Sequence, residues 1–382
     1  MDVLAFAYGL LLGVTGLIPF VHVNTLLDLI PLAPNAVFIV ALSFSHLVFE
    51  TIPAVFFGVP SASQSVSVLP AHEMLLKGQA GTAFKLISSA LLKAILFSFF
   101  LLPLAWLVLP LAFDVVKPLT AVVLLFLLAA FFYSDSSKGR FFGFVVFALS
   151  GTLGFLVFKF VLVPNSLFPL LAGLFGVPAL LVSGKGKLKL DFEGESASAD
   201  SLLVFYGCLL GCFSVLLPAV TPALLSAVVF LFMENDSKRF LQLSSAVVGS
   251  KLFFDFVGVA VIGKARSGAA AFFQQSISSI SLLELAVLLA SGLLAFSLAL
   301  LALAAALPLL KKMLSSLDFG LLNSVILLLV ACGVFFSSGA LGLLVLAAAS
   351  CIGLTALYSG CRRSYATGAL ILPALLYYLG AA

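Results

Sequence analysis

Two pairs of ionisable side chains lie inside apolar segments of the chain, and each pair has a spacing of four residues. His46 and Glu50 form one pair, and Lys251 and Asp255 form the other. Residues four apart lie on one face of a helix, close enough to interact. An ionisable group inside a bilayer costs about 2.5–3.5 kcal/mol on insertion scales, so such groups usually mark a functional site.

The two pairs predict different chemistry. Histidine titrates near neutral pH, so His46/Glu50 is a candidate to carry a coupling proton. Lys251/Asp255 is a candidate to neutralise or bind a carboxylate or a phosphate. The alternative is that each pair is self-neutralised and only locks helix packing. Lys93 is a lone cation in a long apolar segment, and snorkelling to the membrane interface is the simplest explanation for it.

Proline and polar side chains interrupt the first apolar stretch of each half of the chain. Proline removes a backbone donor and frees carbonyl groups in the preceding turn. Non-helical backbone at membrane depth is tolerated only where protein or a watery cavity covers it, and a helix that restarts there aims its N-terminal amides into that cavity. We therefore predict a substrate-binding site at the breaks, with a locally satisfied proline kink as the alternative. The predicted residues are Pro19, His22, Asn24, Thr25, Pro218 and Thr221.

A polar segment follows the His46 helix. Small hydroxyl and amide side chains beside glycine allow the backbone to approach a ligand closely. Residues 263–276 stand at the equivalent place in the second half, so we expect the two segments to form gates on opposite membrane faces, with an ordinary polar loop as the alternative. The residues predicted to contact substrate in the first gate are Ser61, Ser63, Gln64 and Ser65.

The sequence gives little support to catalysis. Its three histidines form no HExxH motif, and GxSxG and metal-type CxxC spacings are absent from the sequence. We therefore predict no catalytic residue, no metal and no cofactor, although an intramembrane enzyme that uses His22 or His46 stays open as an alternative. The net charge of +4 is spread over short loops, so no nucleic-acid partner is expected.

Composition indicates that lipid surrounds these residues. Hydrophobic residues make up 63% of the chain, charged residues make up 9%, and the mean hydropathy is +1.30. A soluble domain has roughly 25% charged residues. Several segments exceed the roughly 18 apolar residues that suggest a membrane span. We predict an all-α polytopic protein of the cell membrane.

The two halves repeat one layout. Tyr8-Gly9 opens the first half and Tyr206-Gly207 opens the second, and each half then has a broken stretch followed by a helix with a charged pair. Duplicated halves with broken helices are how many secondary transporters build a site near the membrane midplane. The predicted divisions are 1–182 for the first repeat, 183–201 for a polar linker and 202–382 for the second repeat.

Lysine and arginine positions indicate how the segments cross the membrane. Spans are predicted near 36–57, 86–110, 119–133, 141–161 and 165–182, and near 240–262, 281–307, 321–336, 339–358 and 366–380, with broken stretches at 3–33 and 202–233. If the broken stretches are re-entrant, thirteen loop lysines and arginines share one side and four lie on the other. If every segment crosses, the split is nine against eight. Because positive residues gather on the cytoplasmic side, we predict about ten transmembrane helices, two re-entrant helical hairpins and two inverted-topology repeats.

Three blocks of sequence resemble the TctA family, the large membrane subunits of tripartite tricarboxylate transporters, and in particular its archaeal members. The blocks are Gly13 to Pro19 with His22, Asn24 and Thr25; Gly58 to Ser61 and Val68 to Gly81; and Phe168 to Pro178. The resemblance implies a small membrane subunit and an extracytoplasmic binding protein as partners, but neither is fused to this chain. Phe20 also replaces the glycine that the family usually has after the first proline.

We therefore predict a permease that moves an anionic substrate, such as a di- or tricarboxylate, by alternating access with proton or cation coupling. The glycine-rich re-entrant layout also resembles a family of polyprenyl-phosphate transporters, so lipid-phosphate translocation is the alternative. A structural membrane protein without transport activity is a third hypothesis. The expected partners are an anionic small molecule or a lipid phosphate, together with the lipid bilayer.

Overall fold

The computed structural model contains helices as its regular elements throughout the residues that it describes. These are residues 2–18, 21–29, 35–56, 71, 74–75, 77–133, 137–164, 166–182, 197–220, 222, 225–226, 229, 236–316 and 319–381. The predicted all-α class is confirmed for this part of the chain.

The helices of the first half are α1 (Val3–Leu12), η1 (Gly13–Leu17), α2 (Val23–Leu29), α3 (Ala36–Phe56), α5 (Ala80–Tyr133), α6 (Ser137–Lys159), α7 (Leu167–Leu171), η2 (Ala172–Gly176) and α8 (Val177–Val182). Those of the second half are α9 (Ser201–Ser214), α11 (Ser237–Ile262), α12 (Gly268–Ser276), α13 (Leu282–Ser316), α14 (Phe319–Ser359), η3 (Arg363–Thr367) and α15 (Gly368–Tyr378). Elements η1 and η3 are 3-10 helices, and η2 is a π-helix.

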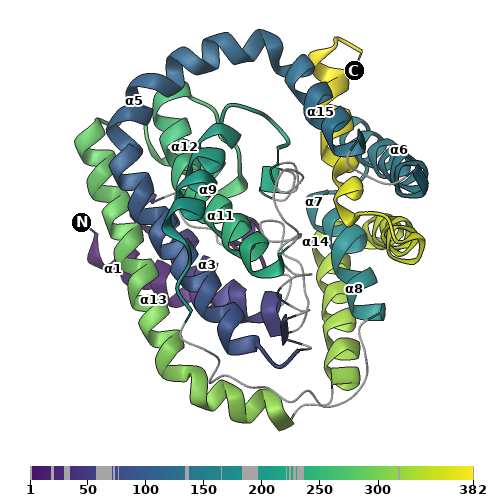
Figure 1. Ribbon diagram of the computed structural model, residues 1–382, viewed down its shortest axis with the longest axis horizontal. Helices are drawn as coiled ribbons and strands as arrows, with labels where there is room; N and C mark the ends of the chain where they lie inside the picture. The colour runs from purple at the N-terminus through teal and green to yellow at the C-terminus, as the bar shows by residue number, and fades with distance from the viewer. Residues whose placement is uncertain are drawn as a thin grey trace.

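Six of the described helices are long and apolar enough to cross a membrane, and two of them differ from the predicted spans. The predicted spans 86–110 and 119–133 form one helix, α5, whose 54 residues correspond to about 81 Å. That length is more than twice the roughly 30 Å of a bilayer core. Three prolines inside α5 are consistent with its curvature, since each removes a helical hydrogen bond, and the helix arches from one side of the molecule to the other (Figure 1). In α14 the predicted spans 321–336 and 339–358 are joined at Gly339, whose positive φ of 68° breaks the helical path.

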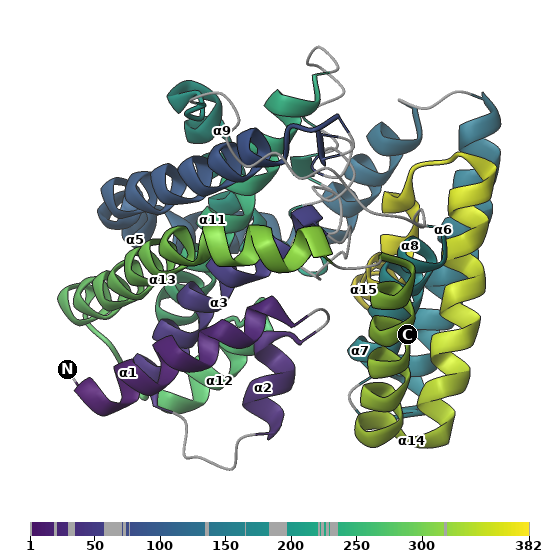
Figure 2. The same ribbon diagram turned by 90° about the horizontal axis from the view of Figure 1, so that it is seen from below.

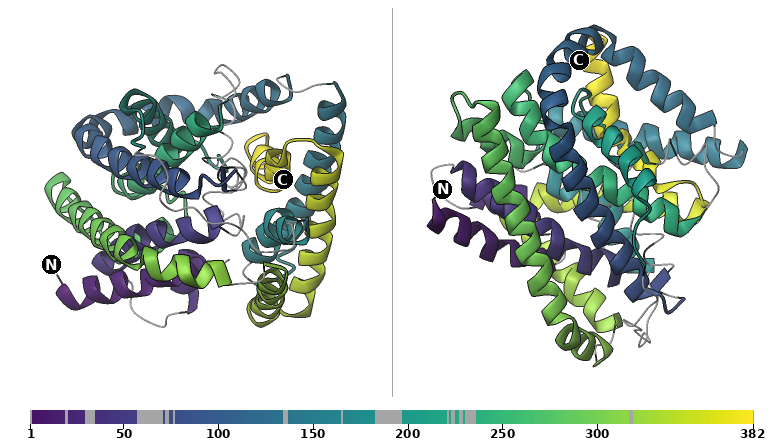
Figure 3. Two further views of the ribbon diagram at one scale, coloured as in Figure 1. Left: turned by 60° about the horizontal axis from the view of Figure 1, so that its bottom comes forward. Right: turned by 60° about the vertical axis from the view of Figure 1, so that its left-hand side comes forward.

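The helices form two lobes, and each lobe contains segments from both halves of the chain (Figure 2). The first lobe consists of α1, α2, α3, α9, α11, α12, α13 and the first part of α5, and the second consists of α6, α7, η2, α8, α14, η3 and α15. The largest cluster of buried apolar side chains lies in the first lobe, and a separate cluster lies in the second. The end of α5 reaches the second lobe, so this helix connects the two (Figure 3).

Helices from the two halves of the chain pack against each other in the first lobe. Helix α3 packs against α1 of its own half and against α13 of the other half. Helix α11 packs in the same way against α9 of its own half and against α5 of the other half. The boundaries 1–182 and 202–382 therefore remain a prediction about the sequence, whereas each lobe in space is shared by both halves.

One close helix contact occurs in both halves with the same geometry. The Ser45 hydroxyl on α3 donates to the Gly9 carbonyl oxygen on α1 at 3.3 Å, and the Ser250 hydroxyl on α11 donates to the Gly207 carbonyl oxygen on α9 at 3.3 Å. In both halves, a Cβ on the glycine four residues further on would lie 1.9 Å from the same serine hydroxyl. This contact holds α3 against α1 and α11 against α9. Each charged pair begins at the residue after the serine, so the contact also fixes the position of the pair.

Candidate functional site

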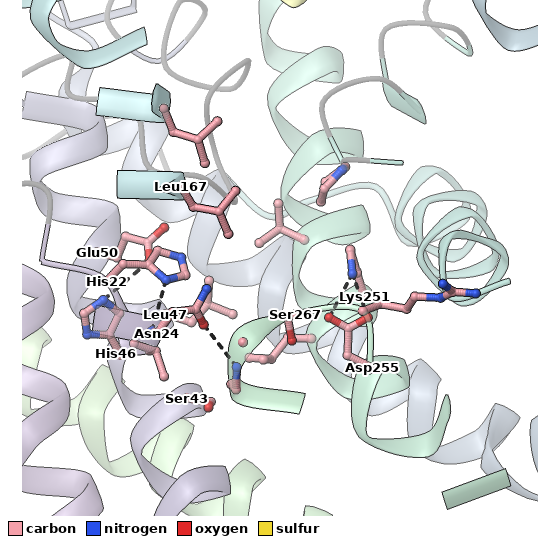
Figure 4. Close-up of a pocket in the computed structure, with 18 of the residues that line it drawn as sticks. His22, Asn24, Ser43, His46, Leu47, Glu50, Leu167, Lys251, Asp255 and Ser267 are labelled. Carbon is pink, nitrogen blue, oxygen red and sulfur yellow. Dashed lines mark hydrogen bonds and ion pairs between the residues drawn. The ribbon is translucent and has the colours of Figure 1, made fainter. Parts of the chain in front are cut away.

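A cavity of about 260 Å³ lies where α2, α3, α11 and the start of α12 meet (Figure 4). This volume is close to the lower end of the roughly 300–1,000 Å³ of small-molecule sites. The first lobe supplies its polar lining, and the second lobe supplies leucines. The polar residues are His22, Asn24, Ser43, His46, Glu50, Lys251, Asp255, Arg266 and Ser267, and the leucines of the second lobe are Leu167, Leu171 and Leu370.

Helix α3 places His46 and Glu50 at the cavity. Its first turn is capped by Asn35, whose Oδ1 accepts the backbone N–H groups of Val37 and Phe38 at 3.0 and 3.1 Å. His46 Nε2 lies 3.7 Å from Glu50 Oε2, which is too long for a hydrogen bond. His46 is 1% exposed, and neither ring nitrogen has a hydrogen-bond partner among the described residues. A buried polar group in this state is uncommon and points to a ligand or a water molecule.

His22 stands beside His46 at the start of α2. The two ring centroids are 6.3 Å apart with an interplanar angle of 64°. His22 Nδ1 accepts the backbone N–H of Asn24 at 3.3 Å, so the neutral ring carries its proton on Nε2. Two imidazoles therefore share one wall of the cavity.

Helix α11 holds a closed ion pair at the opposite wall. Lys251 Nζ donates to both carboxylate oxygens of Asp255, at 2.6 and 2.8 Å. The two side chains are 13% and 4% exposed, so the pair is largely out of contact with solvent. Charge-assisted hydrogen bonds of this length are strong.

Arg266 fixes the broken backbone that follows α9. Its Nε donates to the Val215 carbonyl oxygen at 2.8 Å, and its Nη2 donates to the Leu216 carbonyl oxygen at 3.1 Å. These carbonyls lie just after the last turn of α9, where an ending helix leaves acceptors without partners. Ala219 follows with a positive φ of 59° and lines the cavity. A guanidinium thus stabilises a non-helical wall.

Asn24 links the two halves across the cavity. Its Oδ1 accepts the backbone N–H of Ala269 at 3.0 Å, although the two residues are 245 positions apart. Ser267 caps the same helix, α12, by accepting the N–H of Ala270 at 3.2 Å. The cavity is therefore a shared product of both halves.

A sequence model of the tripartite tricarboxylate transporter TctA family matches residues 3–368. The match spans nearly the whole chain and includes every ionisable residue of the cavity. The chain belongs to the TctA family. No curated protein and no solved structure matches it.

Membership confirms the predicted family, and the archaeal branch stays a prediction. Members of the TctA family are components of tripartite transporters, which also contain a small membrane subunit and a binding protein. The family is one of transporter components and not of enzymes. With six apolar helices of spanning length among its described residues, this TctA-family chain is a multi-pass membrane protein. Among the same residues, no three His, Cys, Asp or Glu side chains are grouped so that they could hold a metal ion.

The structure of this TctA-family chain brings many of the predicted site residues together. The predicted residues that line the cavity are His22, Asn24, His46, Glu50, Lys251 and Asp255. Pro218 lies in the broken segment between Leu217 and Ala219, both of which line the cavity, but it is not itself part of the lining. The predicted residues outside the described part of the chain are Pro19, Ser61, Ser63, Gln64, Ser65 and Thr221, and the side chain of Thr25 is not described either. All of these roles stay predictions.

Sequence reasoning missed Arg266, Ser267 and the Ala269 amide as parts of the site. Arg266 belongs to the segment expected to form the second gate, but its partners are carbonyl groups about fifty residues earlier in the chain. The available signal for Arg266 was an arginine in a short segment between two glycines, Gly263 and Gly268. The amide of Ala269 had none, because every residue other than proline carries a backbone N–H.

Proposed function

We propose that this TctA-family chain is a secondary transporter that binds a small anion, such as a di- or tricarboxylate, in the cavity. The proposal rests on one observation: ionisable residues from both halves of an apolar membrane protein surround a single cavity of about 260 Å³. Burying such groups is costly unless they serve a partner. The volume suits a small solute and not the long chain of a polyprenyl lipid, and nothing in the described residues favours the lipid-phosphate alternative.

The charges of the lining support proton coupling. Lys251 and Arg266 contribute two positive charges, and Glu50 and Asp255 contribute two negative charges, so the empty cavity is neutral when its histidines are neutral. An anion in this low-dielectric site then needs additional positive charge. Protonation of His22 and His46 would supply it, because both imidazoles line the same wall and His46 is not engaged in a hydrogen bond within the described residues. The proposed cycle therefore carries protons together with the anion.

The distribution of the lining between the lobes supports alternating access. The polar groups of the described lining belong to the first lobe, whereas the second lobe contributes Leu167, Leu171 and Leu370. The side chains of these leucines offer no hydrogen-bond partners to the polar residues, whereas Tyr378 on α15 interacts with Arg266 of the lining. Movement of the first lobe along the leucines would therefore exchange the contact between Arg266 and Tyr378. We propose that relative movement of the lobes opens the cavity to one membrane face and then to the other.

The proposed topology has ten crossings, two re-entrant hairpins and two inverted repeats. The glycine–serine contact that α1/α3 and α9/α11 share supports the duplication. The length of α5 and the break at Gly339 in α14 are consistent with two crossings in each of these helices. The count of thirteen against four positive residues supports the inverted orientation. A small membrane subunit and an extracytoplasmic binding protein are proposed partners, because tripartite transporters contain both.

Uptake into proteoliposomes tests the proposed function. Vesicles containing the chain, with and without its candidate partner subunits, receive labelled citrate or succinate under an inwardly directed proton gradient. We expect accumulation above empty vesicles, and loss of the accumulation when a protonophore removes the gradient. Absence of carboxylate uptake at every pH and with every cation tested would overturn the proposal, and uptake that depends on sodium alone would overturn the proton coupling.

A further inference from the structure

The hydrogen bond between Asn24 and Ala269 occupies the N-terminus of a cavity-lining helix. Helix α12 has nine residues, and Gly268 and Ala269 of its first turn line the cavity. Ser267 satisfies the N–H of Ala270, and Asn24 Oδ1 satisfies the N–H of Ala269. The N-terminus of a helix carries a partial positive charge and prefers an anionic acceptor. Asn24 is a neutral acceptor, so this preference is only partly met.

The side chain of Asn24 lies directly against bare backbone. A Cβ on Gly268 would lie 2.4 Å from Asn24 Cγ and 2.5 Å from Asn24 Oδ1. The absence of a side chain at Gly268 thus leaves room for a flat group with an sp² carbon and two heteroatoms. A carboxylate has the same shape as the carboxamide of asparagine, and it adds the negative charge that the helix end prefers.

A second observation indicates that this space receives a ligand. His46 lines the same cavity, is 1% exposed and has two ring nitrogens without hydrogen-bond partners among the described residues. Figure 4 shows His22, His46 and Glu50 on one side of Asn24, with Ser267, Lys251 and Asp255 on the other side. A ligand at the end of α12 would therefore extend toward an imidazole that lacks a partner.

We propose that the N-terminal amides of α12 form a carboxylate subsite, and that Asn24 occupies it as an internal placeholder when substrate is absent. One carboxylate of a small di- or tricarboxylic acid displaces Asn24 Oδ1 from the Ala269 amide, and a second polar group of the acid reaches His46. Displacement also breaks the hydrogen bond that joins α2 to α12, so binding releases a link between the two halves. This inference rests on the proposed function and identifies the ligand end that α12 recognises.

If Asn24 is a placeholder, its removal should increase the affinity for the acid, whereas removal of a direct ligand should decrease it. Asn24→Ala removes the competitor from the Ala269 amide, so citrate and succinate should bind about three- to tenfold more tightly, as expected for one neutral hydrogen bond. Asn24→Ser is too short to reach the amide and should behave like Asn24→Ala. Asn24→Asp places a permanent carboxylate in the subsite and should weaken binding at least about tenfold, through the loss of a charge-assisted contact and through repulsion.

Binding is measured by isothermal titration on the full chain in lipid nanodiscs, with citrate and succinate as separate probes. Asn35→Ala is the matched control, because Asn35 also accepts backbone N–H groups at a helix start but is not part of the cavity lining. It should leave the affinity unchanged.

The outcomes separate this inference from the proposed function. If wild type binds the acids and both Asn24→Ala and Asn24→Ser bind them more weakly, Asn24 is a direct ligand and the placeholder is overturned while the proposed function stands. If Asn24→Asp binds as tightly as wild type, the subsite is overturned. If wild type binds neither acid, the proposed function itself fails, and the subsite fails with it.

Discussion

The charged pairs on α3 and α11 stand at matching positions but have different geometry. Each pair begins at the residue after a serine that donates to a glycine carbonyl at 3.3 Å. On α11, Lys251 and Asp255 form hydrogen bonds of 2.6 and 2.8 Å, whereas on α3 the nearest nitrogen and oxygen of His46 and Glu50 are 3.7 Å apart. The same helix contact therefore carries a hydrogen-bonded ion pair in one half and, in the other, a histidine and a glutamate too far apart for a hydrogen bond. We propose that the pair on α11 provides structural charge balance and that the pair on α3 exchanges the coupling proton.

The largest expected effect is the loss of stability when the closed pair is opened. Asp255→Leu leaves a buried Lys251 ammonium without its counter-charge, which typically costs about 3–5 kcal/mol. The free energy of unfolding in detergent measures it. The double variant Lys251→Met with Asp255→Leu should regain most of the loss, because no charge remains unpaired.

The matched change on α3 completes this test. Glu50→Leu should cost less than Asp255→Leu, because a neutral His46 needs no counter-charge. Equal losses for the two variants would show that both pairs are structural, and the comparison would then break.

The second effect concerns the helix contact that both halves share. Gly13→Ala and Gly211→Ala each place a methyl group 1.9 Å from a serine hydroxyl, and such overpacking typically costs about 1–3 kcal/mol. We expect equal losses in the two halves by thermal unfolding. Ser45→Gly and Ser250→Gly should each recover only part of the loss, because the backbone nitrogens of His46 and Lys251 would still lie 2.9 and 2.8 Å from the new methyl groups. If only one of the two glycine-to-alanine variants lost stability, the two contacts would not be equivalent.

The third effect concerns proton coupling. His46→Gln keeps the size and polarity of the side chain but removes its titration, so proton-driven citrate uptake should fall about tenfold, which corresponds to roughly 1.4 kcal/mol. The remaining uptake should lose the pH dependence that wild type shows. Lys251→Arg is the matched variant, because its charge is permanent: its rate can fall, but its pH profile should keep the shape of wild type. A His46→Gln profile that retains the wild-type midpoint would place the coupling group elsewhere.

Much of this site could be predicted because its signals are local. A spacing of four inside an apolar helix places His46 beside Glu50 and Lys251 beside Asp255, and the cost of burial brings both pairs to one cavity. The proline breaks likewise led to His22 and Asn24.

The remaining features depend on tertiary structure. The continuity of α5 could not be predicted, because prolines inside a long helix bend it without ending it when neighbouring groups satisfy the freed carbonyls. Lys93 was expected to snorkel, yet its ammonium donates to Ser198 Oγ at 3.1 Å, to Ser201 Oγ at 3.2 Å and to the Ala199 carbonyl oxygen. These partners lie more than a hundred residues further along the chain, as does the partner of Asn24. No local pattern encodes such pairings.

The smallest expected effect tests whether the two halves differ at their helix starts as they do at their charged pairs. Asn35 caps α3, and Asp236 caps α11 by accepting the N–H of Lys238 at 2.9 Å. Replacement by alanine should cost about 1 kcal/mol in each half. Asp236→Ala should cost a further 0.3–1 kcal/mol, roughly, because its charge also interacts with the helix dipole, and added salt should reduce this difference. Unfolding measured at low and high ionic strength checks both points. If the difference in stability loss between the two variants does not change with salt, it comes from packing. The electrostatic difference between the two halves would then be limited to the charged pairs.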